Sequence, residues 1–481
     1  MKKFFLCVLL ISVLLGSCSD NSGGSVSDTT ASTSADGEIA ETAAETIASL
    51  PDMNFDGREF TFYIRVTPDD FTADDVVAHE QNGTPINDAV YERNLYIEDK
   101  YNAKISAVEA PINHSVYNPV KNSILADDHA FDVAVSYGYD AARFAQEGLI
   151  HNLKNADYID LTQRWWSPIL SETLTVNNRQ FYATGDISYI DNLGVRCFFF
   201  NKDIVKDLQI EDPYGLVNDN KWVMSKLFEL AALGNMDLNG DGVMNTEDRF
   251  GIQAQSSLGA ILMYASGVSI TAKDSTDTPV LALDTEKSIS ILATLREYMA
   301  SNPSIHYSDV WTNTQARFGE NKVLFQAEVL LMIQSMRGAE VDIGILPAPK
   351  FDESQENYIH FLDAHCMNMY SIPINANEPD DIAFILEAMA QKSVDTLTPA
   401  FYDICLQGKY VRDNESSAML DIIFGSYIME NAELFQWGSL SGLIPGTLKD
   451  GKDIVSAVEA NKAATQAAIE KSIAALDENY N

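Results

Sequence analysis

The chain has 481 residues, which is more than one hydrophobic core usually holds and predicts two or three domains. Apolar residues make up 46% of it, which excludes a disordered chain. The formal net charge of -38 argues against binding to nucleic acid or to an anionic lipid surface, because both are polyanions. The composition therefore favours a folded protein that binds a neutral or cationic solute.

The N-terminus has the pattern of an export signal. Lys2 and Lys3 precede an apolar run at residues 4–15, which is too short to span a bilayer as a mature helix. The run ends in Leu-Gly-Ser-Cys18, which resembles the lipobox of bacterial lipoproteins. That resemblance implies removal of residues 1–17, acylation of Cys18 with palmitate-type chains, and anchoring at the outer face of the cytoplasmic membrane. The alternative is a plain secretory signal with a chance cysteine.

The segment after the signal holds almost nothing to bury. Residues 18–54 are rich in Ser, Thr, Ala, Gly and acidic residues, which predicts a flexible tether. The three later cysteines are too widely spaced for a disulfide framework or a zinc site. We expect each of them to be a buried small hydrophobe: Cys197, Cys366 and Cys405.

From residue 55 onward, predicted strands and helices alternate. The strands are expected at residues 60–66, 104–108, 131–136, 323–333, 341–346 and 367–374. The helices are expected at residues 86–101, 140–146, 222–233, 289–301, 382–392 and 454–476. This alternation predicts an α/β fold with parallel or mixed sheets that helices cover on both faces.

Two polar breaks between apolar runs predict crossings between interleaved lobes. The first lies within residues 181–203 and the second within residues 334–338. An ordinary β-hairpin fits the first stretch equally well. If both are crossings, the chain divides into lobe 1 (55–188 plus 337–393) and lobe 2 (189–336 plus 394–481). A ligand cleft is expected beside such crossings.

Residues 237–248, DLNGDGVMNTED, follow the spacing of an EF-hand calcium loop. The side-chain ligands would be Asp237, Asn239, Asp241 and Asp248. Val243 would bind through its carbonyl, and Asn245 either directly or through a water molecule. Asp248 stands where EF-hands usually have Glu, and its shorter side chain reaches an ion less easily. The prediction is a structural Ca²⁺ site; the alternative is an Asn/Gly-rich turn without metal.

Catalytic signatures are incomplete. The segment GSLSG at residues 438–442 has Leu440 where a nucleophile elbow needs serine. His360 and His365 are five residues apart, which does not place them on one helical face. The 70 acidic residues are too many for spacing to single out a glycosidase pair. Several tryptophans near predicted loops could stack on sugar rings or pack in the core: Trp165, Trp166, Trp311 and Trp437.

Several segments resemble the extracellular solute-binding lipoproteins of ABC importers, in particular the carbohydrate-type proteins of clostridia and related bacteria. Among them are NGTPINDAVYERNLYIEDKYNAKI, FDVAVSYGYDAARFAQEGLIHNL, WWSPILSETLTVNNRQFYATGDIS and VDIGILPAPKFDESQENY. The resemblance implies a two-lobed fold like that of maltose-binding protein, which closes on a sugar by hinge motion without altering it. It also implies a monomer that delivers the sugar to an ABC permease.

Matched motif by motif, the resemblance places these residues at the ligand: Tyr137, Tyr139, Asp140, Asp186, Tyr189, Asp191, Arg337 and Trp437. Arg337 stands where maltose-binding proteins often have an aromatic residue, which argues against a malto-oligosaccharide. Arg337 could instead pair with Asp186 or Asp191 as a structural contact. The other functional hypotheses are a receptor for peptides or another polar solute, and a surface carbohydrate-active enzyme or adhesin.

Overall fold

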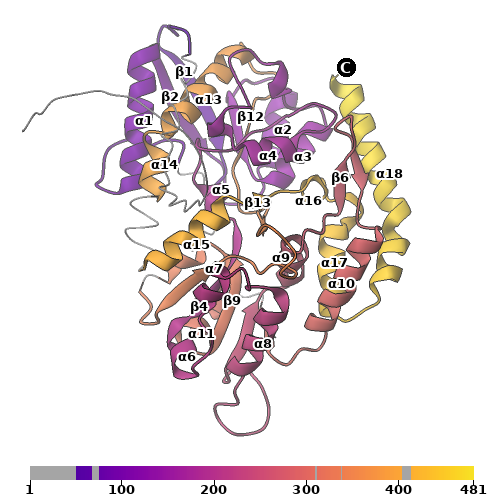
Figure 1. Cartoon of the computed structure of the whole chain (residues 1–481). Coiled ribbons are helices and arrows are strands. Elements are labelled where there is room, and N and C mark those ends of the chain that lie inside the picture. Colours follow the sequence, from indigo (N-terminus) through magenta and orange to yellow (C-terminus); the bar gives the residue numbers. More distant parts are fainter. Residues whose placement is uncertain (1–49, 68–74, 309–310, 337, 403–412, 481) are drawn as a thin grey trace, which may run out of the picture. The chain divides into compact units, whose positions relative to one another are not determined.

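The first sheet has the order β12-β3-β1-β2 (Figure 1). The structure is a computed structural model, and it describes residues 50–67, 75–308, 311–336, 338–402 and 413–480, which belong to one unit. The strands are β1 (Arg58–Ile64), β2 (Ala103–Glu109), β3 (Val133–Ser136) and β12 (Met369–Ser371). β1 runs parallel to β2 and β3, and β12 is antiparallel to β3, so the sheet is mixed as predicted.

Helices cover both faces of this sheet because its strands are apolar on both sides. Phe60, Phe62 and Val133 pack with α1 (Pro85–Tyr101) and α13 (Pro379–Ser393). Ala134, which points the other way along β3, packs with α2 (Tyr117–Ala126) and α3 (Gly138–Gln146). Short helices complete this part of the chain: η1 (Leu153–Asn155), η2 (Arg164–Trp166), α4 (Pro168–Leu174) and α14 (Leu397–Pro399).

The second sheet has the order β10-β4-β9-β5-β8. Its strands are β4 (Arg196–Asn201), β5 (Phe250–Ala254), β8 (Ile305–Tyr307), β9 (Val323–Val329) and β10 (Ile343–Leu346). The helices between them are α5 (Ile190–Leu193), α6 (Lys202–Asp207), α7 (Pro213–Asn218), α8 (Met224–Gly234), α9 (Leu258–Ala265), α10 (Glu286–Met299), α11 (Trp311–Gly319) and α12 (Met332–Ser335). β4 is antiparallel to β9 and β10, whereas β5 is parallel to β8 and β9.

The chain passes from one sheet to the other where the first crossing was predicted. Ala183 forms a bridge with Tyr370 of β12, and the chain then turns through α5 into β4 of the second sheet. The second passage lies later than predicted, because β10 pairs with β4 although residues 337–393 were grouped with the first sheet. Ile343 and Ile345 of β10 are buried in the same core cluster as Cys197 and Phe199 of β4, which agrees with this pairing.

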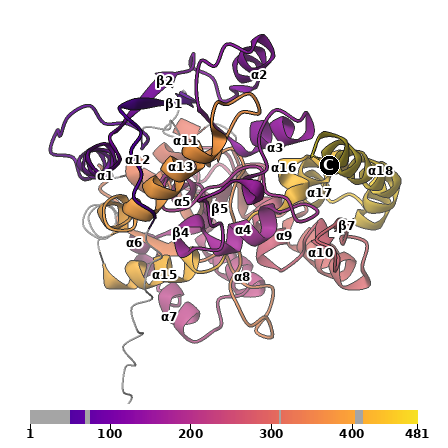
Figure 2. The same ribbon diagram turned by 90° about the horizontal axis from the view of Figure 1, so that it is seen from above.

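The last part of the chain is helical, as predicted. It contains α15 (Asn414–Phe424), α16 (Asn431–Leu434), η4 (Trp437–Ser439), α17 (Leu440–Lys449) and α18 (Ile454–Tyr480). Two small sheets accompany it: β11 (His360–Phe361) with β13 (Tyr427–Ile428), and β6 (Thr271–Lys273) with β7 (Pro279–Leu281). α18 packs on α17 and α10 and also on α3 (Figures 1 and 2). Within the described part of the chain, no helix has the length and apolar character that crossing a bilayer requires.

Two adjacent tryptophans are held by one buried carboxylate. The indole Nε1 atoms of Trp165 and Trp166 donate to the two carboxylate oxygens of Glu387, at 3.0 and 2.5 Å. Both rings are buried in the core of the first sheet, so they pack and do not line the pocket described below. Burial raises the pKa of Glu387 to about 7, although the indole hydrogen bonds act in the opposite direction.

This raised pKa predicts a pH-dependent stability. The folded chain keeps the Glu387 proton up to about pH 7, whereas the unfolded chain releases it near the ordinary pKa of 4.5. The contribution of this group is therefore complete below pH 4.5 and is lost as the pH rises through 7. Urea unfolding at several pH values should show that Glu387→Gln loses less stability over this window than the wild type. Glu59→Gln, which changes an exposed residue, should follow the wild type; identical pH curves for all three proteins would contradict the prediction.

Candidate ligand-binding site

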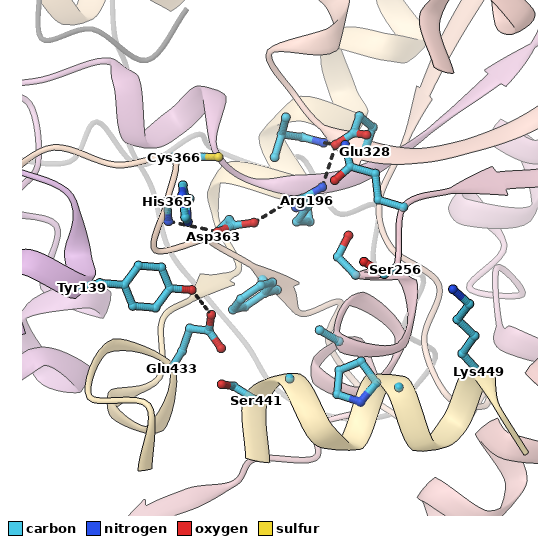
Figure 3. A pocket seen from close by; sticks show the side chains of 18 of the residues that line it. Tyr139, Arg196, Ser256, Glu328, Asp363, His365, Cys366, Glu433, Ser441 and Lys449 are labelled. Atoms are coloured by element: carbon cyan, nitrogen blue, oxygen red, sulfur yellow. Dashed lines mark hydrogen bonds and ion pairs between the residues drawn. The ribbon is translucent and has the colours of Figure 1, made fainter. Parts of the chain in front are cut away.

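A cavity of about 810 Å³ is lined by residues of the second sheet, by Tyr139 after strand β3 of the first sheet, and by residues of the helical tail. This volume lies within the range of small-molecule sites. Tyr139 follows β3, Arg196 begins β4 and Glu328 lies near the end of β9. Asp363 and His365 come from the loop between β11 and β12, and α17 runs along the side opposite Arg196 and Glu328 (Figure 3).

Arg196 is the charged centre of one wall. Its guanidinium donates to Glu328 Oε1 and to Asp363 Oδ2, at 2.6 Å in both cases. The Arg196 and Glu328 side chains are only 7% and 1% exposed. Such burial is costly unless the hydrogen-bonding atoms are satisfied. Arg196 Nε and Glu328 Oε2 nevertheless have no protein partner, so this wall keeps one unused donor and one unused acceptor.

The two carboxylates beside Arg196 respond differently to their surroundings. Burial alone would raise the pKa of Asp363, but the charge and hydrogen bonds of Arg196 outweigh it and the pKa is lowered. Burial raises the pKa of Glu328, and the charge of Arg196 only partly opposes this. Asp363 is therefore the firmly ionised partner of the arginine.

A second polar pair lies on the neighbouring wall. The Tyr139 hydroxyl, in the first turn of α3, donates to Glu433 Oε1 of α16 (Figure 3). Burial is the main cause that raises the pKa of Glu433 to about 7, and the charge of Asp363 adds to it. The hydrogen bonds from Tyr139 and Ser441 act in the opposite direction. Glu433 can therefore hold a proton near neutral pH.

Aromatic rings gather at the same edge of the pocket. The ring of His365 lies 5.2 Å from that of Tyr137 and 5.5 Å from that of Tyr139, measured between centroids. Phe361, which lines the pocket, stacks on Tyr264 at 4.6 Å. Rings beside hydrogen-bonding carboxylates can hold a ligand that has both apolar and polar faces.

Comparison with known proteins gives matches in structure alone. No protein-family model matches this chain, and neither does any curated protein sequence. A cyclo/maltodextrin-binding protein complexed with maltotetraose matches with a TM-score of 0.55 and 11% identity, over 87% of this chain and 96% of that one. The chain has the fold of the two-lobed solute-binding proteins. This confirms the fold class that the sequence predicted.

Two further solved structures match this chain in fold. One is UspC of M. tuberculosis, with a TM-score of 0.54 and 13% identity over 85% of this chain and 100% of that one. The other is the ABC substrate-binding protein Lmo0181 from Listeria monocytogenes in complex with cycloalternan. Its TM-score is 0.51 at 10% identity, over 88% of this chain and 99% of that one.

Of the ligand-binding residues predicted from the sequence, Tyr139 lines the pocket. Tyr137 stands beside it through its ring contacts with Tyr139 and His365. Asp140 lies away from the pocket lining, where its carboxylate accepts hydrogen bonds from the Ser115 hydroxyl and the Val116 amide ahead of α2. Arg337 lies outside the described residues.

The aspartates of the first crossing lie outside the lining of this pocket. Asp191 is 2% exposed and accepts from its neighbour's amide and from the Thr184 hydroxyl, and burial raises its pKa to about 8. Burial also raises the pKa of Asp186, to about 6. Tyr189 packs on Phe401 with ring centroids 5.4 Å apart. These three residues are not among those that line the pocket, so their role at a ligand stays a prediction.

Trp437 packs in the core of the second sheet. It is 2% exposed, its Nε1 donates to Ser472 Oγ at 2.8 Å, and its ring stacks on Phe435 at 5.0 Å. It therefore joins η4 to α18 and does not line the pocket.

Most of the pocket's charged residues were not predicted. A usable signal was present, because Arg196 and Glu328 lie in otherwise apolar strands, where a charge is rarely buried unless it is paired. The spacing of His360 and His365 gave no sign of a site, but His365 and the neighbouring Asp363 both line the pocket. Glu433 gave no comparable signal in the helical tail.

The predicted calcium loop folds as a series of tight turns. Asp237 accepts from the amides of Gly240 and Gly242, at 2.7 and 2.8 Å. Asp248 accepts from the amides of Leu238 and Asn245, at 2.9 Å each. Within the described residues, no group of three His, Cys, Asp or Glu side chains is spaced to hold a metal ion. The amide and carbonyl oxygens of Asn239, Asn245 and Val243 would have to complete any site, so calcium binding stays a prediction.

Proposed function

We propose that this protein captures a carbohydrate in the pocket around Arg196 and delivers it unaltered to an ABC permease. The observation that carries the proposal is the pairing of unused buried hydrogen-bonding atoms, on Arg196 and Glu328, with the aromatic edge at Tyr139 and His365. A sugar hydroxyl both donates and accepts a hydrogen bond, so it suits a wall that offers one donor and one acceptor. The fold of the sugar-bound proteins described above supports the same conclusion.

The energetics are sufficient without any chemistry on the ligand. A micromolar dissociation constant corresponds to a standard free energy of binding of about −8 kcal/mol. Hydrogen bonds to charged groups contribute about 1.5–3 kcal/mol each, and a few of them together with ring stacking supply this amount. The free energy of binding would favour the closed form over the open one, because only the closed form lets both lobes contact the ligand.

A glycoside hydrolase is the second candidate function, and one observation favours it. Glu433 and Asp363 are two carboxyl groups of the same pocket whose pKa values are shifted in opposite directions, to about 7 and downward respectively. A glycosidase uses such a pair as general acid and ionised partner. In this protein, however, Asp363 is paired with Arg196 and Glu433 with Tyr139.

One experiment separates these functions. The chain without residues 1–18 is mixed with cellotetraose, xylotetraose, maltotetraose or, as a test of the peptide hypothesis, trialanine. We expect at least one tetrasaccharide to raise the Tm and to be recovered intact by chromatography. Release of reducing ends above background would identify an enzyme, and a shift with trialanine alone would identify a peptide receptor.

Anchoring through Cys18 is part of the proposal, and residue 18 lies outside the described part of the chain. The motif Leu-Gly-Ser-Cys at residues 15–18 supports it. Metabolic labelling with a palmitate analogue should mark the wild type and leave Cys18→Ala unlabelled. Labelling of that variant would contradict the lipoprotein assignment.

We also propose that residues 237–248 bind Ca²⁺ and stabilise the second lobe. Calcium should then raise the Tm of the wild type relative to chelator, and Asp237→Ala should remove most of that difference by deleting one carboxylate ligand. Asp219→Ala, an exposed aspartate outside the loop, is the matched control and should respond like the wild type. Equal melting of the wild type in calcium and in chelator would exclude the site.

A further inference from the structure

One helix face of the pocket is almost free of side chains. α17 lines the cavity with Ser441, Gly442, Pro445 and Gly446, while Leu440, Ile444 and Leu448 are buried on its other side. A Cβ atom added at Gly442 or at Gly446 would meet nothing within 4 Å. The space above these two glycines is therefore part of the cavity, and the helix backbone forms its floor.

Pro445 changes the hydrogen bonding of this floor. An α-helical carbonyl normally accepts from the amide four residues later, but proline has no N–H. The carbonyl oxygen of Ser441 thus lacks its helical donor. Both Ser441 and Pro445 line the cavity. The floor offers a flat apolar strip and one backbone acceptor beside it.

The wall opposite the floor independently indicates a ligand. Glu328 is 1% exposed and Arg196 7%, both line the same cavity, and each keeps one atom without a protein partner. In Figure 3 these side chains lie across the pocket from the helix that runs between Ser441 and Lys449. A molecule in this cavity would meet charged hydrogen-bonding groups on one side and bare backbone on the other.

We propose that α17 is a ring-binding subsite. A pyranose ring lies with its C–H face over Gly442 and Gly446, donates one hydroxyl to the Ser441 carbonyl, and turns its other hydroxyls toward Glu328 and Arg196. This subsite rests on the proposed carbohydrate binding. It adds that the backbone of α17 recognises the C–H face of the sugar ring by its shape. A flat, equatorially substituted ring fits such a floor, because axial substituents would hold it away from the backbone.

The test uses substitutions that improve the helix but fill the subsite. Alanine and leucine are better helix formers than glycine, so Gly446→Ala, Gly446→Leu and Gly442→Ala should keep or raise the Tm, by roughly 1–3 °C. The same variants should weaken binding of the tetrasaccharide that the wild type binds best, by about tenfold for alanine and more for leucine. Gly215→Ala is the matched control. Gly215 is the third residue of α7, as Gly442 is of α17, and it lies outside the pocket.

Calorimetric titration and thermal melting of the chain without residues 1–18 read out both effects. Affinities of the Gly442 and Gly446 variants equal to that of Gly215→Ala would overturn the subsite while leaving carbohydrate binding intact. A lower Tm in these variants would contradict the free space above the glycines and would overturn the subsite as well. If the wild type binds none of the three tetrasaccharides, the proposed function fails first, and the subsite fails with it.

Discussion

Replacing Arg196 with methionine should destabilise the protein by about 3–5 kcal/mol, because the change leaves Glu328 and Asp363 without their cation. Glu328 is 1% exposed, so water solvates its charge poorly once the guanidinium is removed. Methionine has a similar length and fills much of the same space, which limits any cavity effect. Chemical denaturation should report the loss as a lower midpoint with an unchanged slope.

A matched control is available on the surface of the second lobe. Lys226 also contacts two carboxylates, those of Glu211 and Glu229, but these are 57% and 60% exposed. Lys226→Met should cost no more than about 1 kcal/mol. Adding Glu328→Gln and Asp363→Asn to Arg196→Met should recover much of the loss, since no buried charge is then unpaired. If Arg196→Met and Lys226→Met lower the stability equally, the charge of Arg196 does not stabilise the buried carboxylates of Glu328 and Asp363, and the prediction is wrong.

Replacing Tyr139 with alanine should weaken tetrasaccharide binding by about tenfold to a hundredfold, which is the usual effect of removing an aromatic residue that anchors a ligand. The ring contributes the stacking surface beside His365, and its hydroxyl holds Glu433 in place. Tyr139→Phe keeps the ring and removes the hydrogen bond, so its affinity should fall between those of the wild type and Tyr139→Ala.

Calorimetric titration measures the tetrasaccharide affinity of both Tyr139 variants. The control is Tyr96→Ala, which truncates a tyrosine on α1 that is 43% exposed. Binding by Tyr96→Ala should equal that of the wild type. If Tyr139→Ala binds as tightly as Tyr96→Ala, the aromatic edge takes no part in ligand capture.

The fold could be predicted from the sequence because its periodicity is strong. The alternation along β1 and the helical spacing along α1 agree with the core in which these elements are buried, and β3 is a short apolar run that is buried throughout. The sheet predicted for β10 was wrong, because the sequence of a short apolar strand does not indicate which strand it pairs with. Its pairing with β4 depends on contacts between residues that are more than a hundred positions apart.

The candidate site was predictable only in part. Tyr139 could be inferred because a residue directly after a buried strand lies at the sheet edge. Asp191 and Trp437 have the chemistry of ligand-binding residues, but tertiary packing buries them at the crossing and under α18. Arg196 and Glu328 lie on the neighbouring strands β4 and β9, more than a hundred residues apart in the sequence, so local spacing does not reveal their contact. Glu433 reaches the same pocket from α16, again only through the fold.

A crystal structure of the chain with its best-bound tetrasaccharide tests the central claim most directly. The account predicts electron density for an intact sugar in the pocket, with hydroxyls within hydrogen-bond distance of Glu328 or Asp363 and a ring near Tyr139. Sugar bound elsewhere, for example against Asp186 and Tyr189, or a cleaved sugar in the pocket, would contradict it.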